Sequence, residues 1–309
     1  MNKNEFQQTN EQLLNIYCGI LFHAAEFQEG QDVSFSYWFD CPEFSELREK
    51  YPIEKIAGKG GDFQRALRLC RWLAPRLKHK GDYDNHVPCN SLALLDYCFE
   101  KEDVGINCVN KAKILAECCL ALGIYARRLL MYPLSPYDMD NHVVTEIFDR
   151  GLSKWILLDP TAGSYFTDGE HPLSALEARA LFAQRGRVSV VLNRQNPKNV
   201  DGLSQKLYNL YYNAYYAKNF YRLSVEAVSE FGDAHRPPVS ERYPNWDLLP
   251  KGFDGRRWSL QNGSFRIDGA RRFGYEEGLL KELEQRLDRD MENYRVQAGT
   301  VKMWDPPTA

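Results

Sequence analysis

The spacing of apolar residues predicts a series of helices in the first part of the chain. Residues 1–56 have a mostly helical pattern that Pro42 and Pro52 interrupt. A short helix is expected from about residue 90 to 100. The clearest pattern lies at 62–77, where apolar residues recur with the helical period of about 3.6, namely Phe63, Ala66, Leu67, Cys70, Leu73, Ala74 and Leu77.

A third helix begins at Asn107, a favourable N-cap residue, and ends before Gly123, a residue type that commonly closes helices. Cys108 lies in the first turn of this helix. Because Cys108 is four residues before the first member of the apolar stripe, its thiol is expected at the head of the buried face. The stripe consists of Ala112, Leu115, Ala116, Cys119 and Leu122.

Apolar runs after this helix predict strands at 126–132, 142–148 and 155–159. A long tyrosine-rich helix is expected from about 203 to 231. Its tyrosines recur on one helical face, either as core packing, which we favour, or as a wall of a substrate cleft. They are Tyr208, Tyr211, Tyr212, Tyr215 and Tyr216.

The chain divides into three parts on these patterns. An N-terminal helical segment covers 1–56, and a core with the following aromatic helix covers 57–231. Residues 232–309 form an appended region of unknown role, which Pro237-Pro238 introduces. This region is expected to be turn-rich to about residue 274 and then to form a charged helix.

The last two predicted strands bring an imidazole and a carboxylate together. Gly151 suits a tight hairpin turn because such turns need a residue that tolerates positive φ. With Arg150 and Gly151 as the two central residues, His142 lies directly opposite Asp159, and their Cβ atoms are ~5 Å apart. A longer turn of the same parity keeps both side chains on one face of the sheet.

These residues suggest a thiol nucleophile with a base and an orienting group. A carboxylate such as Asp159 fixes the tautomer of a neighbouring imidazole and stabilises its protonated form. Cys108 at a helix N-terminus is favoured as a thiolate by the unpaired N–H groups there. If the strands of His142 and Asp159 pack on the buried face of that helix, all three side chains meet.

The segments GINCVNKAKILAECCLALGIYARRLL, HVVTEIF and KWILLDPTAGSYF resemble the transglutaminase-like superfamily, which shares the papain-like cysteine-enzyme fold. The resemblance covers about 105–166 well and the helices from 62 onward more loosely. The matching positions are Gly105, Asn107 and Cys108, then Gly123 to Arg127, then His142 and Glu146, and finally Trp155, Asp159 and Pro160.

The resemblance implies an α+β, papain-like or transglutaminase-like fold, with the nucleophile helix packed on a small antiparallel sheet and extra helices around it. It implies Cys108 as nucleophile, His142 as general base and acid, and Asp159 as orienting residue. The oxyanion side chain of the family lies before the cysteine. We assign it to Asn90, with Trp72 as the second choice.

Composition limits the other classes of function. Hydrophobic residues make up 44% and aromatic residues 13% of the 309 residues, which is typical of an ordered globular protein. A net charge of -3 gives no basic surplus for nucleic acid or anionic membranes. The chain has no apolar stretch of membrane-spanning length and no convincing signal peptide.

The eight cysteines follow no disulfide or zinc spacing, so free thiols in a reducing cytoplasm are expected. The core positions of Cys70, Cys98, Cys118 and Cys119 favour packing over chemistry. His86 and Cys89 have a metal-like spacing but lack a second pair, and no nucleotide or calcium loop is present. We therefore expect no cofactor and no metal.

The sequence thus predicts a cysteine-dependent enzyme that carries out covalent acyl transfer on a peptide or protein amide. Hydrolysis is slightly favoured over transfer to an amine, because the loop before His142 is short and no second acceptor motif is visible. The alternative is a silent member of the same superfamily that binds partners through the aromatic helix and the C-terminal region.

Overall fold

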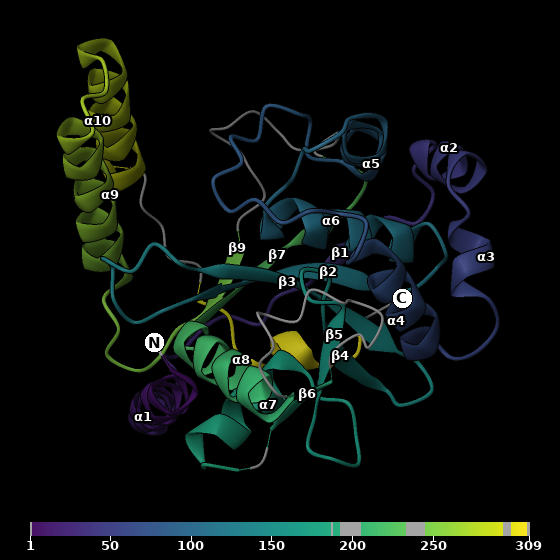
Figure 1. The fold of residues 1–309 in the computed structure, drawn as a ribbon, viewed down its shortest axis with the longest axis horizontal. Coiled ribbons are helices and arrows are strands. Elements are labelled where there is room, and N and C mark those ends of the chain that lie inside the picture. Colours follow the sequence, from purple (N-terminus) through teal and green to yellow (C-terminus); the bar gives the residue numbers. More distant parts are fainter. Residues whose placement is uncertain (1, 187, 192–204, 233–244, 293–297, 308–309) are drawn as a thin grey trace.

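A seven-stranded antiparallel sheet is the centre of the computed structural model, which describes residues 2–186, 188–191, 205–232, 245–292 and 298–307. The strand order is β6-β5-β4-β3-β2-β7-β9 (Figure 1). Its strands are β2 (Ala126–Tyr132), β3 (His142–Asp149), β4 (Lys154–Asp159), β5 (Ser164–Thr167), β6 (Ser189–Val191), β7 (Arg222–Glu226) and β9 (Asn245–Leu248). A separate parallel pair joins β1 (Ser36–Tyr37) to β8 (Val228–Ser229).

Helices cover both faces of the sheet (Figure 1). One face carries α2 (Glu43–Lys50), α3 (Ile53–Ala57), α4 (Asp62–Leu73), α5 (Ser91–Glu100) and α6 (Cys108–Leu120). The other face carries α1 (Lys3–His23), α7 (Ala175–Ala183) and α8 (Gln205–Asn219). A pair formed by α9 (Gly255–Arg272) and α10 (Glu277–Glu292) stands beside the body, and a short 3-10 turn, η3 (Val301–Trp304), follows it.

The α+β class and the antiparallel sheet are confirmed, and the three predicted strands form as β2, β3 and β4. Helix α6 packs on the sheet through Thr145 of β3, whose hydroxyl donates to the carbonyl oxygen of Ala112 at 3.0 Å. The helix is buried on all sides rather than along one stripe. Its Lys113–Glu117 pair, 3.2 Å apart, is therefore buried too.

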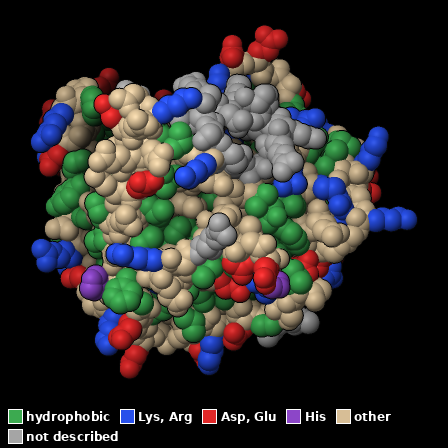
Figure 2. Space-filling view, turned by 60° about the horizontal axis from the view of Figure 1, so that its bottom comes forward, with side chains coloured by type: hydrophobic (Ala, Val, Ile, Leu, Met, Phe, Trp, Pro, Cys, Tyr) green, Lys and Arg blue, Asp and Glu red, His purple; other side chains and the backbone are tan. Residues whose placement is uncertain are grey.

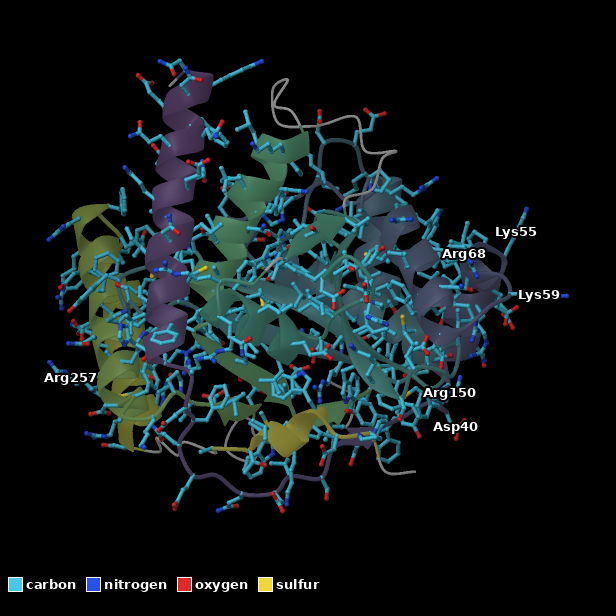
Figure 3. The ribbon with its side chains drawn as sticks, turned by 90° about the horizontal axis from the view of Figure 1, so that it is seen from below. Asp40, Lys55, Lys59, Arg68, Arg150 and Arg257 are labelled. Carbon is cyan, nitrogen blue, oxygen red and sulfur yellow. The ribbon has the colours of Figure 1, made fainter. Side chains whose placement is uncertain are left out.

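The β3–β4 turn has four residues, so the predicted two-residue turn is wrong. Asp149 pairs with Lys154, and Ser153 rather than Gly151 has a positive φ of 50°. Asp62 at the start of α4 accepts hydrogen bonds from the Arg150 guanidinium at 2.7 and 2.8 Å. In Figure 3, Arg150 lies at the edge of the molecule opposite Arg257 of α9.

The tyrosine-rich helix is shorter than predicted. The structure begins to describe α8 at residue 205, so the expected start at 203 lies outside the described residues. The helix ends at Asn219, and residues 222–226 instead form β7, which pairs with β2. Leu223 and Val225 are fully buried in that strand, so tertiary pairing outweighs the helical pattern.

The expected turn-rich stretch before residue 274 contains an 18-residue helix, α9. Asp254 caps it by accepting a hydrogen bond from the N–H of Arg257 at 2.9 Å. Gly263 lets Leu287 of α10 pack against the helix backbone, where a Cβ atom would clash. The predicted charged helix forms as α10, and the three-part division of the chain stays a prediction.

The C-terminal segment packs against the sheet through a buried ion pair. Arg127 of β2 and Glu146 of β3 are both fully buried, with 2.8 Å between Nη2 and Oε2. The carbonyl oxygen of Met303 accepts a hydrogen bond from Arg127 Nη1 at 2.7 Å, and Trp304 Nε1 donates to Glu146 at 2.9 Å. Trp155 stacks on the guanidinium at 3.9 Å.

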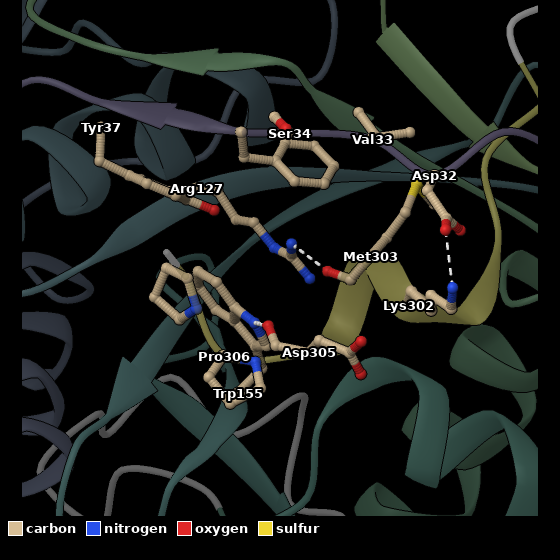
Figure 4. A pocket seen from close by; sticks show the side chains of 12 residues that line it. Asp32, Val33, Ser34, Tyr37, Arg127, Trp155, Lys302, Met303, Asp305 and Pro306 are labelled. Carbon is tan, nitrogen blue, oxygen red and sulfur yellow. Dashed lines mark hydrogen bonds and ion pairs between the residues drawn. The ribbon is translucent and has the colours of Figure 1, made fainter. Parts of the chain in front are cut away.

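A cavity of about 180 Å³ lies beside this pair (Figure 4). Tyr37, Trp155 and Pro306 line it together with Arg127. Nε, Nη1 and Nη2 of Arg127 all donate to protein oxygens. The guanidinium is therefore a structural cation here, neutralised by Glu146.

Charged side chains of both signs are interspersed with apolar ones on the face shown in Figure 2. None of the helices within the described ranges combines the length and the apolar character needed to cross a bilayer.

Removing one member of the buried ion pair is expected to destabilise the fold by about 3–5 kcal/mol, because the remaining charge stays in a dry environment. Arg127→Met should show this loss in urea unfolding. Lys251→Met is the control, since its pair with Glu26 is exposed and should contribute nothing measurable. Equal stabilities of the two variants would contradict the prediction.

Candidate active site

Cys108 is the first residue of α6, as the capping pattern predicts. Asn107 is the N-cap, and its side-chain oxygen accepts a hydrogen bond from the N–H of Asn110 at 3.3 Å. The side chains of Asn107 and Asn110 both donate to Asn85, at 3.1 and 2.8 Å. This network fixes the start of the helix. The N–H groups of Cys108 and Val109 have no acceptor within the helix itself.

His142 is the first residue of β3, and it lies next to both Cys108 and Asp159. Its Nε2 atom is 3.1 Å from Oδ2 of Asp159. The thiol of Cys108 interacts with the same imidazole and with the backbone N–H of Val143. The three predicted side chains are therefore brought together at one end of β3.

The register differs from the predicted one, yet both side chains stay on one face. Thr145 pairs with Leu158, so Asp159 is level with Val144 and not with His142. The shift is two residues, which preserves the parity of the side chains. His142 and Asp159 are therefore diagonal neighbours across the two strands, and the imidazole is long enough for its Nε2 atom to reach Asp159.

The charge of His142 makes Cys108 an unusually acidic thiol. Burial is the largest influence and raises the pKa of Cys108. The hydrogen bond and the positive charge of His142 outweigh burial, together with the N–H of Val143, so the pKa is lowered from its ordinary value. In contrast, burial raises the pKa of Cys70 and Cys118.

His142 and Asp159 stabilise each other's charged forms. Burial alone would lower the pKa of His142, but the Asp159 carboxylate and the contact with Cys108 raise it to about 10. Burial alone would raise the pKa of Asp159. The charge of His142 and hydrogen bonds from Tyr216 and from the N–H of Thr161 instead lower it to about 2.

The tyrosine-rich helix α8 lies directly against this pair. The ring centroids of Tyr215 and Tyr216 are 5.4 and 5.6 Å from that of His142. Tyr216 is fully buried and its hydroxyl donates to Oδ2 of Asp159, a contact that sequence reasoning missed. Tyr211, at 39% exposure, faces outward. The helix thus packs in the core and also contacts the predicted site.

The loop 133–141, which leads into His142, is held by α8 and α9. Lys218 of α8 lies 3.1 Å from Asp138 and 3.0 Å from Asp140. Trp258 of α9 donates its indole N–H to the carbonyl oxygen of Leu134 at 2.9 Å. The position of His142 therefore depends on Lys218 of α8 and Trp258 of α9, which follow it in the sequence by 75 residues or more.

A buried lysine lies one turn after the thiol. Lys111 Nζ donates to the carbonyl oxygen of Leu77 at 2.6 Å, and burial lowers its pKa to about 8. The sequence did not predict that Lys111 is buried, because a lysine on a helix normally reaches solvent.

The predicted oxyanion residues occupy structural positions. The side-chain oxygen of Asn90 caps α5 by accepting from the N–H of Ala93 at 2.8 Å. Trp72 of α4 packs edge-on against Phe99 and carries Arg76 over its ring. Their assignment to an oxyanion hole stays a prediction.

The cysteines predicted to pack in the core do so. Cys70, Cys118 and Cys119 are fully buried, and Cys98 packs half-buried against the same core. His86 contacts Asp84 at 2.5 Å. Within the ranges that the structure describes, no group of three or more His, Cys, Asp and Glu side chains is arranged to hold a metal ion.

Comparison with known proteins agrees with the sequence resemblance. The family model of the transglutaminase-like superfamily matches residues 50–160, a segment that contains Cys108, His142 and Asp159. A solved structure of a candidate cysteine protease from Cytophaga hutchinsonii is 22% identical, with a TM-score of 0.30. That match covers 38% of this chain and 37% of the other, so it spans well under half of either protein. No curated protein matches the chain.

The His142–Asp159 pair should make stability depend on pH. Asp159 has a folded pKa of about 2, below its ordinary value, so its contribution is present above about pH 4 and is lost as pH falls towards 2. His142 has a folded pKa of about 10, so its contribution is present below about pH 6.5 and is lost as pH rises towards 10.

The free-energy difference between wild type and Asp159→Asn is therefore expected to be largest between about pH 4 and 6.5, at about 2 kcal/mol. Chemical unfolding across pH 2–10 measures it. Asp288→Asn on the exposed face of α10 is the control and should track wild type. A difference that does not vary with pH would mean that the two groups are not coupled.

Proposed function

We propose that this chain, whose residues 50–160 belong to the transglutaminase-like superfamily, is a cysteine-dependent enzyme that cleaves an amide by covalent acyl transfer. The observation that supports this most directly is the continuous series of contacts from Cys108 through His142 to Asp159. Such a series of thiol, imidazole and carboxylate is the arrangement that activates a sulfur nucleophile.

The first half of the reaction forms a thioester. The Cys108 thiolate attacks the carbonyl carbon of the amide, and the C=O electron pair moves to oxygen. The backbone N–H of Cys108, which has no acceptor within the helix, is the proposed donor to that oxyanion. His142 Nε2 faces Asp159, so its Nδ1 proton passes to the departing nitrogen as the C–N bond breaks.

The second half regenerates the thiol enzyme. An acceptor O–H or N–H attacks the thioester while His142 removes its proton, and the C–S bond breaks to return the thiolate. Asp159 stabilises the imidazolium in both halves without taking up the proton itself. Water as acceptor gives a carboxylic acid, and a primary amine gives a new amide.

We propose hydrolysis as the main outcome. The loop 133–141 is short, and α8 and α9 hold it through Lys218 and Trp258. A loop held in this way is poorly suited to close over the thioester and exclude water. The substrate class is a peptide or protein amide.

Selective alkylation of Cys108 tests the proposed function. Iodoacetamide at mildly acidic pH should modify Cys108 at least about tenfold faster than the other thiols, because its thiolate fraction is higher. His142→Ala should slow that reaction by about tenfold or more. His171→Ala is the control, since this exposed histidine pairs with Asp168, and it should leave the rate unchanged. Peptide mass spectrometry gives the rate at each cysteine.

A Cys108 that reacts no faster than Cys89 or Cys98 would overturn the enzyme proposal. The silent binding module would then be the better account of the chain.

The fate of the thioester separates hydrolysis from transfer. We expect a pool of glutamine-containing peptides and peptide amides, incubated with a fluorescent primary amine, to yield mainly free acids and few amine adducts. Mass spectrometry distinguishes the two products. Cys108→Ala should abolish both, and a majority of amine adducts at about millimolar amine would instead favour a transglutaminase reaction.

A further inference from the structure

Tyr216 lies near the C-terminal end of α8, well outside the segment 50–160 that the superfamily model matches. Its side chain is fully buried, and its hydroxyl donates a hydrogen bond to Oδ2 of Asp159. The same oxygen faces Nε2 of His142 at 3.1 Å. The other carboxylate oxygen accepts from the N–H of Thr161 at 2.7 Å.

We propose that Tyr216 is a positioning residue of the catalytic site, which acts through Asp159. This role rests on the proposed function of Cys108 and His142. Tyr216 keeps the carboxylate ionised and oriented towards the imidazole, and it touches neither the substrate nor the reacting sulfur.

The need for such a donor follows from burial. Asp159 is 1% exposed, and an ionised carboxylate in that environment is costly unless several donors satisfy its oxygens. His142 and Thr161 supply one donor each. The hydroxyl of Tyr216 supplies a third, and it shares Oδ2 with the imidazole, so it also fixes the direction of that oxygen.

The surroundings hold the phenol in place and keep it neutral. The ring of Tyr216 packs edge-on against Phe166 at 4.5 Å and against His142 at 5.6 Å. Phe220, one turn later, lies at 6.3 Å. Burial and the Asp159 charge raise the pKa of Tyr216 well above its ordinary value, so it remains a donor throughout the working pH range.

Tyr212 offers a matched control one turn earlier on the same helix. Its ring stacks on that of Tyr216 at 6.0 Å, and its hydroxyl bonds to that of Tyr208 at 2.9 Å. Tyr212→Phe therefore removes the hydroxyl of a half-buried tyrosine from α8 without removing a donor to Asp159.

The test compares Tyr216→Phe, Tyr212→Phe, Asp159→Asn and the double variant Tyr216→Phe/Asp159→Asn. Alkylation of Cys108 by iodoacetamide is followed from about pH 2 to 8, a range that reaches the folded pKa of Asp159 at about 2. In Tyr216→Phe the pKa of Asp159 should rise, since a donor to its ionised form is lost. Protonated Asp159 no longer stabilises the imidazolium. The fall in the Cys108 alkylation rate at low pH, the acid limb of the pH–rate profile, should therefore move to higher pH by about one unit. At a given pH on that limb, the variant should react roughly tenfold more slowly than wild type.

Tyr212→Phe should keep the wild-type limb. Adding Tyr216→Phe to Asp159→Asn should change the rate by less than about twofold, because the residue through which Tyr216 acts is already neutral. Thermal unfolding and the alkylation rates of the buried Cys70 and Cys118 show whether a variant destabilises the whole fold. Such destabilisation would raise the alkylation rates of all thiols and would not shift the acid limb of Cys108.

An acid limb in Tyr216→Phe that coincides with that of Tyr212→Phe overturns the positioning role alone, provided that wild-type Cys108 is activated. A further large loss in the double variant overturns it as well. Wild-type Cys108 that labels no faster than the other thiols overturns the proposed function, and the positioning role with it.

Discussion

The burial of the Asp159 carboxylate is the constraint on which the candidate site depends. An ionised group in a dry environment costs several kcal/mol unless donors surround it. Here the donors come from β3 through His142, from the turn after β4 through Thr161, and from α8 through Tyr216. These elements meet only when strands and the helix layer below them are assembled together. The same contacts that make Asp159 tolerable therefore fix the imidazole beside Cys108.

Two other buried carboxylates tie distant segments to the core in the same way. Glu146 accepts from Arg127 and from Trp304, which comes near the C-terminus. Glu117 accepts from the N–H of Gly232 at 2.7 Å and pairs with Lys113. Each carboxylate needs partners that its own helix or strand cannot supply. Segments after residue 160 thus satisfy charges inside the superfamily segment.

Local pattern was sufficient for the elements that carry the predicted site. An N-cap asparagine placed Cys108 at a helix start, and side-chain parity kept His142 and Asp159 on one face even though the turn between them was misread. The pairing of β7 with β2 could not be predicted from local pattern in the same way. Leu223 and Val225 fit a helix or a strand equally well until β2 is beside them. The contact of Tyr216 spans 57 residues, and no local periodicity encodes a partner at that separation.

Burial also explains why the three side chains would act as one unit. In a low-dielectric environment each isolated charge is unfavourable, but neighbouring opposite charges attract more strongly than they would in water. The protonated imidazole of His142 thus favours the thiolate of Cys108, and the Asp159 carboxylate favours the protonated imidazole. Tyr215 and Tyr216 cover the imidazole with aromatic rings and keep that environment dry. The reactivity proposed for Cys108 would then depend on the sheet together with the helices on both of its faces. The segment 50–160 alone contains Cys108, His142 and Asp159 but lacks the helix α8 that packs against them.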